Sequence, residues 1–155
     1  MKVGIIMGST SDLEIMSAAF GVLDKFGVPY EKKVISAHRA PALLADWASS
    51  ARQRGIDVII TGAGGAAHLP GVTAAYTTLP VIGVPISGKA FGGMDALLSI
   101  VQMPSGIPVA TVSVNGAKNA ALLALSILSV NDPSLEAKLQ DFRREQTEAI
   151  LNTEI

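Results

Sequence analysis

Short apolar segments alternate along this chain with segments whose apolar residues recur every three or four positions. The apolar segments predict five strands: Val3–Met7, Tyr30–Ser36, Val58–Thr61, Val81–Val84 and Val109–Val112. Three of these strands are almost continuously apolar, which is typical of parallel strands covered by helices on both faces. Connections that contain Gly or Pro separate the strands from the helical segments. The pattern predicts a three-layer α/β/α fold with a parallel sheet in the middle.

The helical segments fill the intervals between the predicted strands. In the first, apolar residues recur at helical spacing from Leu13 to Leu23, and Gly27 closes the helix. Further helices are expected over 41–54, 69–76 and 94–102. We expect a flavodoxin-like strand order, in which the first strand lies between the second and the third. That order brings the loops at the carboxyl ends of these three strands together.

The last third of the chain differs from the rest. Residues 115–130 are apolar nearly all round and predict a helix that must be buried. Asp132-Pro133 then begins a helix of alternating charge, which carries a few apolar residues on one side. Little chain remains to cover both helices, so we expect 115–155 to form subunit contacts, with 1–155 as a single domain. Ordinary core packing is the alternative.

Composition narrows the classes of function. Charged residues make up 16% of the chain, against about 25% in an average soluble domain, and this apolar surplus favours a homo-oligomer. The net charge of -1 gives no reason to expect a nucleic-acid partner. No apolar run reaches the roughly 18 residues of a membrane span. The chain has no cysteine, and its first residues do not resemble a signal peptide, so we expect a cytoplasmic protein.

The first candidate for chemistry is the loop Ser36-Ala37-His38-Arg39, which contains one of only two histidines. It follows a predicted strand and precedes a helix that Pro41 opens. Ligands of open α/β sheets bind at this edge, so a titratable imidazole beside a permanent cation suggests proton transfer on an anionic substrate. A lone histidine is usually structural, and an arginine at a helix start is usually only solvated.

A glycine and three residues with hydroxyl groups follow the first predicted strand, in the loop from Gly8 to Asp12. Such a loop at a helix N-terminus suits a phosphate, although Asp12 would repel one and is a better partner for a sugar hydroxyl. The same residues also have a purely structural explanation. Ser11 and Glu14 fit a capping box, and Asp12 would stabilise the helix dipole without any ligand.

Small residues dominate the loop after the third predicted strand, from Thr61 to Gly71, which holds the second histidine, His68. Their backbone N–H groups are accessible, and the space between them suits a compact, mostly uncharged group. The alternative is a tight turn in which His68 caps a backbone group. Two histidines at predicted strand ends are better evidence for a site than either one alone.

Five blocks of the sequence resemble the class I 5-(carboxyamino)imidazole ribonucleotide mutase family of de novo purine biosynthesis. The blocks are 8–12, 36–39, 64–71, 80–85 and 99–104, and the resemblance is collinear from Val3 to about Val130. It implies an isomerase that moves a carboxylate from the exocyclic nitrogen of the substrate to a ring carbon, giving 4-carboxy-5-aminoimidazole ribonucleotide. It also implies a homo-octamer. Ala40 and Ala96 stand where the family often has threonine and serine, and neither is expected to carry chemistry.

By motif position, the resemblance implies that His38 is the catalytic proton carrier and that no metal or cofactor takes part. The substrate-binding residues that it implies are Ser9, Ser11, Asp12, Ser36, Arg39, Gly64, Gly65, Ala66, His68 and Leu69. A protonated His38 would release CO2 from the N-carboxylate, and a closed pocket would hold that CO2 until the ring carbon attacks it.

Two alternatives remain open at this point. A sister branch of the family carboxylates free aminoimidazole ribonucleotide directly with CO2. It typically has lysine at the position of Arg39 and lacks the block 64–71, so Arg39 and His68 favour the mutase. The expected fold also suits a flavin-binding electron carrier. One tryptophan and two tyrosines, however, offer few aromatic rings to pack against a flavin.

Overall fold

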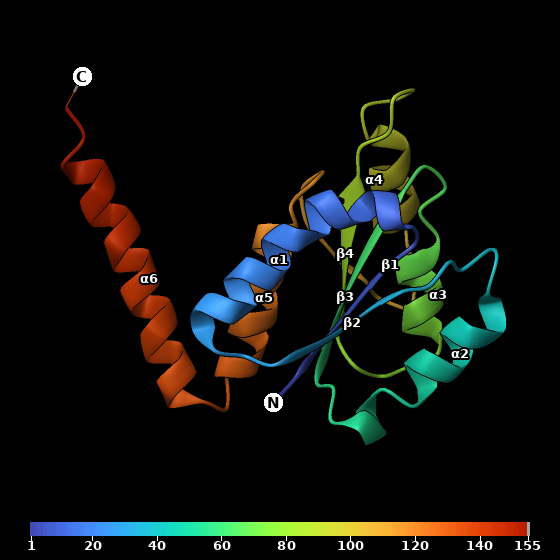
Figure 1. Cartoon of the computed structure of the whole chain (residues 1–155), viewed down its shortest axis with the longest axis horizontal. Coiled ribbons are helices and arrows are strands. Elements are labelled where there is room, and N and C mark those ends of the chain that lie inside the picture. Colours follow the sequence, from blue (N-terminus) through green and yellow to red (C-terminus); the bar gives the residue numbers. More distant parts are fainter. Residues whose placement is uncertain (155) are drawn as a thin grey trace.

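The computed structural model describes residues 1–154, and its centre is a five-stranded parallel sheet (Figure 1). The strands are β1 (Val3–Met7), β2 (Tyr30–Val34), β3 (Val58–Gly64), β4 (Val81–Ile86) and β5 (Ala110–Thr111). Their order is β2-β1-β3-β4-β5, and every neighbouring pair is parallel. The first strand therefore lies between the second and the third, which confirms the predicted flavodoxin-like order.

Helices cover both faces of the sheet. They are α1 (Leu13–Phe26), α2 (Pro41–Ser49), α3 (Leu69–Ala75), α4 (Met94–Val101), α5 (Ala117–Ser129) and α6 (Pro133–Leu151). Helices α1 and α5 pack on one face, and α2, α3 and α4 lie on the other (Figure 1). Within residues 1–154, no helix has the length and apolar character needed to cross a membrane.

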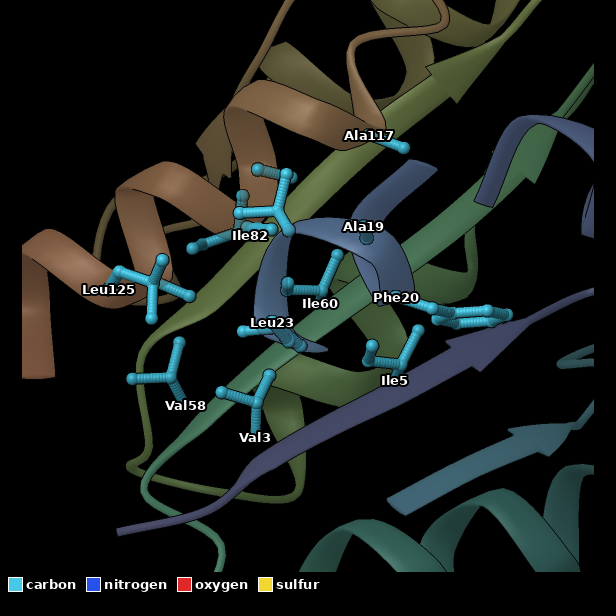
Figure 2. Packing of buried hydrophobic residues seen from close by; sticks show 14 of the residues in the cluster. Val3, Ile5, Ala19, Phe20, Leu23, Val58, Ile60, Ile82, Ala117 and Leu125 are labelled. Atoms are coloured by element: carbon cyan, nitrogen blue, oxygen red, sulfur yellow. The ribbon is translucent and has the colours of Figure 1, made fainter. Parts of the chain in front are cut away.

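The core consists of two apolar clusters, one on each side of the sheet. Figure 2 shows part of the cluster under α1 and α5, with side chains from β1, β3 and β4 pointing toward both helices. Successive strand residues point to opposite faces, so Ile5 belongs to this cluster and Ile6 to the other. Both are fully buried, which explains why β1, β3 and β4 are almost continuously apolar.

Several element boundaries differ from those predicted. The helix expected over 41–54 ends at Ser49, and a separate 3-10 turn, Arg52–Arg54, closes at Gly55 with φ 76°. Strand β2 stops earlier than expected, and β3 runs three residues further, to Gly64. β3 is paired on both sides, and its ladder with β4 continues to the pair Gly64 and Ile86. Sheet pairing rather than local residue preference therefore sets the end of β3.

The C-terminal helices pack on α1, on the sheet and on each other. Helix α5 buries its alanine-rich face against α1 and the sheet. On its outer side, however, Leu123 remains exposed in the single chain, so the predicted burial of that side would need a subunit contact. Helix α6 begins where Asp132 accepts a hydrogen bond from the N–H of Leu135. Its first half packs Leu139 and Phe142 against the core, and its second half projects away from the body (Figure 1).

Candidate active site

A cavity of about 380 Å³ opens at the carboxyl edge of the sheet, where β1, β2, β3 and β4 end. It is lined by Gly8, Ser9, Ser11, Asp12, Ser36, Ala37, His38, Arg39, Ala63, Gly64, Gly65, Ala66, Leu69, Ile86, Ser87 and Gly88. The three loops singled out in the sequence therefore meet in one place. A larger hollow of about 800 Å³ lies near the start of β4, and none of the site residues predicted from the sequence lines it. We therefore take the smaller cavity as the candidate active site, because the site residues predicted from the sequence gather there.

The first loop is organised by Ser9. Its hydroxyl accepts the N–H of Ser11 at 3.3 Å, and its own N–H donates to Asp12 Oδ2 at 3.0 Å. Ser9 and Asp12 thus form the capping box of a 3-10 turn, Thr10–Asp12, that precedes α1. The predicted box of Ser11 with Glu14 is wrong, because this extra turn moves the helix start to Leu13.

Asp12 is the buried carboxylate of the cavity, with only 9% of its surface exposed. Burial raises the pKa of the Asp12 carboxyl, and hydrogen bonds from Ser9, Ser11 and Gly8 partly offset that rise. A carboxyl group whose pKa is raised by burial in a cleft is a candidate functional group. Asp12 therefore caps the 3-10 turn and at the same time lines the cavity.

Arg39 is held by two oxygen atoms at the mouth of the cavity. Its Nε donates to Ser36 Oγ at 3.2 Å, and its Nη2 donates to the carbonyl of Gly8 at 3.3 Å. Ser36 Oγ also accepts the main-chain N–H of Arg39 at 3.3 Å. These contacts link the loops after β1 and β2, and they leave further guanidinium N–H groups for an anion.

The two histidines contact each other directly. His38 Nε2 lies 2.8 Å from His68 Nδ1, and the rings are nearly perpendicular, with an interplanar angle of 87°. The alternative in which His68 caps a backbone group is wrong, since its side chain makes no capping bond to α3. One of the two facing nitrogens must carry the shared proton and the other must accept it. His68 contacts His38 but is not among the residues that line the cavity.

The wall between the histidine loop and β4 is made of backbone and small side chains. A Cβ atom placed on Gly64 would lie 3.2 Å from the carbonyl oxygen of Ile86, which is tighter than ordinary contact. Gly65 adopts φ +61°, a conformation that favours glycine. Ala66 and Leu69 complete this uncharged part of the cavity. No charged side chain lines this part of the cavity.

The structure adds residues that sequence reasoning missed. Ile86 is the last residue of β4, and with Ser87 and Gly88, which follow it, it completes the cavity on its far side from Arg39. None of them is titratable, so residue type gave no signal. Their position did, because β4 neighbours β3 and ends at the same edge. None of the lining residues is Phe, Tyr or Trp, and within residues 1–154 no three His, Asp or Glu side chains are grouped as metal ligands would be.

Comparison with known proteins identifies the family of this chain. The family model described as AIR carboxylase matches residues 2–149. The chain belongs to the AIR carboxylase family. As a member of that family it is similar to curated proteins named N5-carboxyaminoimidazole ribonucleotide mutase. The protein from Vibrio parahaemolyticus is 62% identical over 153 residues, covering 97% of this chain and 95% of its own length. The protein from Bacillus subtilis is 65% identical over 147 residues, covering 94% and 90%.

The same family relationship extends to an archaeal protein and to a crystal structure. The mutase of Pyrococcus abyssi is 65% identical over 144 residues, covering 93% of this chain and 83% of its own. The crystal structure of Treponema denticola PurE superposes with a TM-score of 0.87 at 29% identity, covering 97% of this chain and 94% of that one. This AIR carboxylase family member therefore has its relatives' fold over nearly its whole length.

Proposed function

We propose that this chain is an isomerase of purine biosynthesis that converts N5-carboxyaminoimidazole ribonucleotide into 4-carboxy-5-aminoimidazole ribonucleotide. The observation that carries the proposal is the single cavity in which the His38 loop, the Ser9 loop and the glycine wall meet. Curated relatives of that name, 62% and 65% identical over nearly the whole chain, support the same reaction.

The ribonucleotide is held by groups from the first two loops. Arg39 binds the phosphate through the guanidinium N–H groups that Ser36 and Gly8 do not use. Ser9 and Ser11 supply hydroxyl groups beside it, and Asp12 accepts hydrogen bonds from the ribose hydroxyls. Gly64, Gly65, Ala66 and Leu69 surround the carboxylate and the CO2 that it releases.

The reaction consists of a decarboxylation followed by a carboxylation. His38 donates a proton to the exocyclic nitrogen, the bond from nitrogen to the carboxylate carbon breaks, and CO2 leaves. The electron-rich ring carbon then attacks that CO2, which the small-residue wall keeps beside it. Neutral His38 removes the proton from the ring carbon, which restores the aromatic ring and the starting state of the enzyme.

The histidine pair suits a group that must act first as an acid and then as a base. His38 Nε2 is engaged by His68, and no hydrogen bond to His38 Nδ1 is found within residues 1–154. In the proposed cycle Nδ1 exchanges the proton with the substrate. Nε2–H of His38 donates to His68 Nδ1 throughout this cycle. His38 is therefore the imidazolium before it gives up the Nδ1 proton and the neutral imidazole afterwards, and His68 holds its ring in place.

His38→Asn tests this mechanism, because asparagine keeps hydrogen-bonding capacity but cannot carry a proton near neutral pH. The variant should assemble and bind the ribonucleotide normally, and mutase turnover should fall by roughly 100- to 10,000-fold. Near-native turnover in this variant would rule out His38 as the proton carrier.

Isotope labelling separates the mutase from the direct carboxylase. If the CO2 stays in the cavity, product formed by the wild type in labelled bicarbonate remains largely unlabelled. Heavy label incorporation would place this chain with the branch that carboxylates free aminoimidazole ribonucleotide. A flavin-binding carrier is less well supported, because the lining residues include no aromatic ring of Phe, Tyr or Trp.

A cytoplasmic homo-octamer is part of the same proposal. Besides the projecting half of α6, an apolar row runs along the loop before α4 and along α4 itself. Its members are Phe91, Met94, Leu98 and Val101, and each has close to half or more of its surface exposed. Exposed apolar rows of this kind mark contacts between proteins. We place subunit contacts on this row as well as on residues 115–155.

A further inference from the structure

Asn115 and Ser87 join two connections that the proposed mechanism does not use. Ser87 follows β4, and Asn115 precedes α5. Asn115 Oδ1 accepts the main-chain N–H of Ser87 at 3.0 Å, and Asn115 Nδ2 lies 2.9 Å from Ser87 Oγ. The main-chain N–H of Asn115 also donates to the carbonyl of Pro85 at 2.8 Å. Two hydrogen bonds to Asn115 thus hold Ser87 at the cavity wall, and a third holds Asn115 beside Pro85.

These contacts also determine whether the Ser87 hydroxyl donates or accepts in its hydrogen bond with Asn115. The main-chain N–H of Ser87 can only donate, so it must face Oδ1 of Asn115, and Nδ2 must face the hydroxyl. Because an amide NH2 can only donate, Ser87 Oγ is the acceptor in that bond. Its own proton is therefore available, and no other partner of Ser87 Oγ is found within residues 1–154.

The backbone of Asn115 shows that this arrangement is held against a conformational cost. Asn115 has φ 60°, and among residues 1–154 it is the one non-glycine residue with positive φ. Asparagine tolerates this region better than most residues, but it is still uncommon there. Such conformations persist where the surroundings fix them, and they cluster at functional sites.

Ser87 lies at the end of the cavity opposite to Arg39. The strand order puts β1 and β3 between the strand that precedes Arg39 and the strand that precedes Ser87. Ser87 directly follows Ile86, whose strand partner is Gly64 in the small-residue wall. A ribonucleotide with its phosphate at Arg39 would therefore direct its imidazole ring and carboxylate toward Ser87.

We propose that Ser87, oriented by Asn115, is a further substrate-binding residue and donates a hydrogen bond to the carboxylate on the imidazole ring. Asn115 is a positioning residue, since it acts through Ser87. The inference rests on the proposed function, because it takes a carboxylated aminoimidazole ribonucleotide as the ligand. It assigns to the loop after β4 a role in distinguishing this ligand from the decarboxylated ribonucleotide.

The test compares two ligands on one variant. Ser87→Ala should weaken binding of 4-carboxy-5-aminoimidazole ribonucleotide roughly tenfold, the loss expected for a hydrogen bond to a charged group. Binding of aminoimidazole ribonucleotide, which lacks the carboxylate, should stay within about twofold of the wild type. Ser129→Ala is the matched control, because its hydroxyl on α5 bonds to the carbonyl of Ser126 and lies outside the cavity.

Asn115→Gly tests the orienting contact without adding backbone strain, since glycine adopts φ 60° readily. It should give the same selective loss as Ser87→Ala, and the double variant should lose little more than either single variant. Equal weakening of both ribonucleotides by Ser87→Ala, or unchanged binding of both, would overturn the inference. A wild type that binds both ligands in these experiments leaves the proposed function intact, whereas a wild type that binds neither would overturn the proposed function itself.

Discussion

The contact between His38 and His68 leads to a prediction about a residue that does not touch the cavity. His68→Leu removes the nitrogen that lies 2.8 Å from His38 Nε2 but keeps an apolar side chain of moderate size. His68→Asn retains a polar atom close to the position of Nδ1. If His68 serves to hold and orient His38, the asparagine variant should work well and the leucine variant poorly.

The size of the effect follows from the contact. A hydrogen bond between neutral groups contributes about 0.5–1.5 kcal/mol net. Both rings are exposed in the single chain, so water competes for the same nitrogens and the lower half of that range applies. His68→Leu should therefore lower kcat by roughly two- to fivefold. His38→Asn, which removes the proton carrier itself, should lower it by roughly 100-fold or more.

Initial rates of conversion of the N-carboxylated ribonucleotide, measured over a range of pH, would check this. A positioning role predicts that His68→Leu lowers kcat and changes the pH profile while KM stays nearly constant. His68→Asn should retain kcat within about twofold. Wild-type kcat and pH dependence in His68→Leu would refute the reasoning, and so would an asparagine variant that is as impaired as the leucine variant.

Three further predictions follow from the other parts of the structure. Arg39→Lys should weaken ribonucleotide binding more than it lowers the free energy of unfolding, because lysine cannot reproduce the bidentate contact; titration calorimetry and urea unfolding measure the two effects. Burial raises the pKa of Asp12 in the folded state, so its contribution to stability is present at low pH and is lost as pH rises through that raised value. Asp12→Asn should therefore have a higher free energy of unfolding than the wild type at neutral pH, and urea unfolding at acid pH should show no difference between the two. Its affinity for the ribonucleotide should fall. Light scattering should show that the wild type is an octamer and that the Leu98→Glu variant is dissociated. A monodisperse wild-type monomer at micromolar concentration would contradict the proposed octamer.

The arrangement of strands was predictable because it depends on patterns that the sequence displays. Alternating apolar and helical segments indicated a parallel sheet, and the strand order then followed from the flavodoxin-like topology. Given that order, the loops of Ser9, His38 and Gly64 had to meet at one edge. The cavity confirms that they do.

What the sequence did not predict are the contacts that depend on side-chain direction. The bond between His38 and His68 needs two particular ring orientations on loops 30 residues apart. Ser9 rather than Ser11 begins the capping box because of a single extra 3-10 turn. Local residue preferences are compatible with either choice, and tertiary packing decides between them.

Asn115 shows how a site residue can be hidden by a strong helical pattern. The apolar run from 115 onward placed Asn115 inside a helix, but the helix starts at Ala117. Asn115 instead adopts a left-handed conformation and reaches back to Ser87, which follows β4. Its side chain satisfies the backbone N–H of Ser87, just beyond the end of β4. The need to satisfy that group, rather than helix propensity, accounts for asparagine at this position, and under the proposal above it leaves the Ser87 hydroxyl free to donate to the carboxylate.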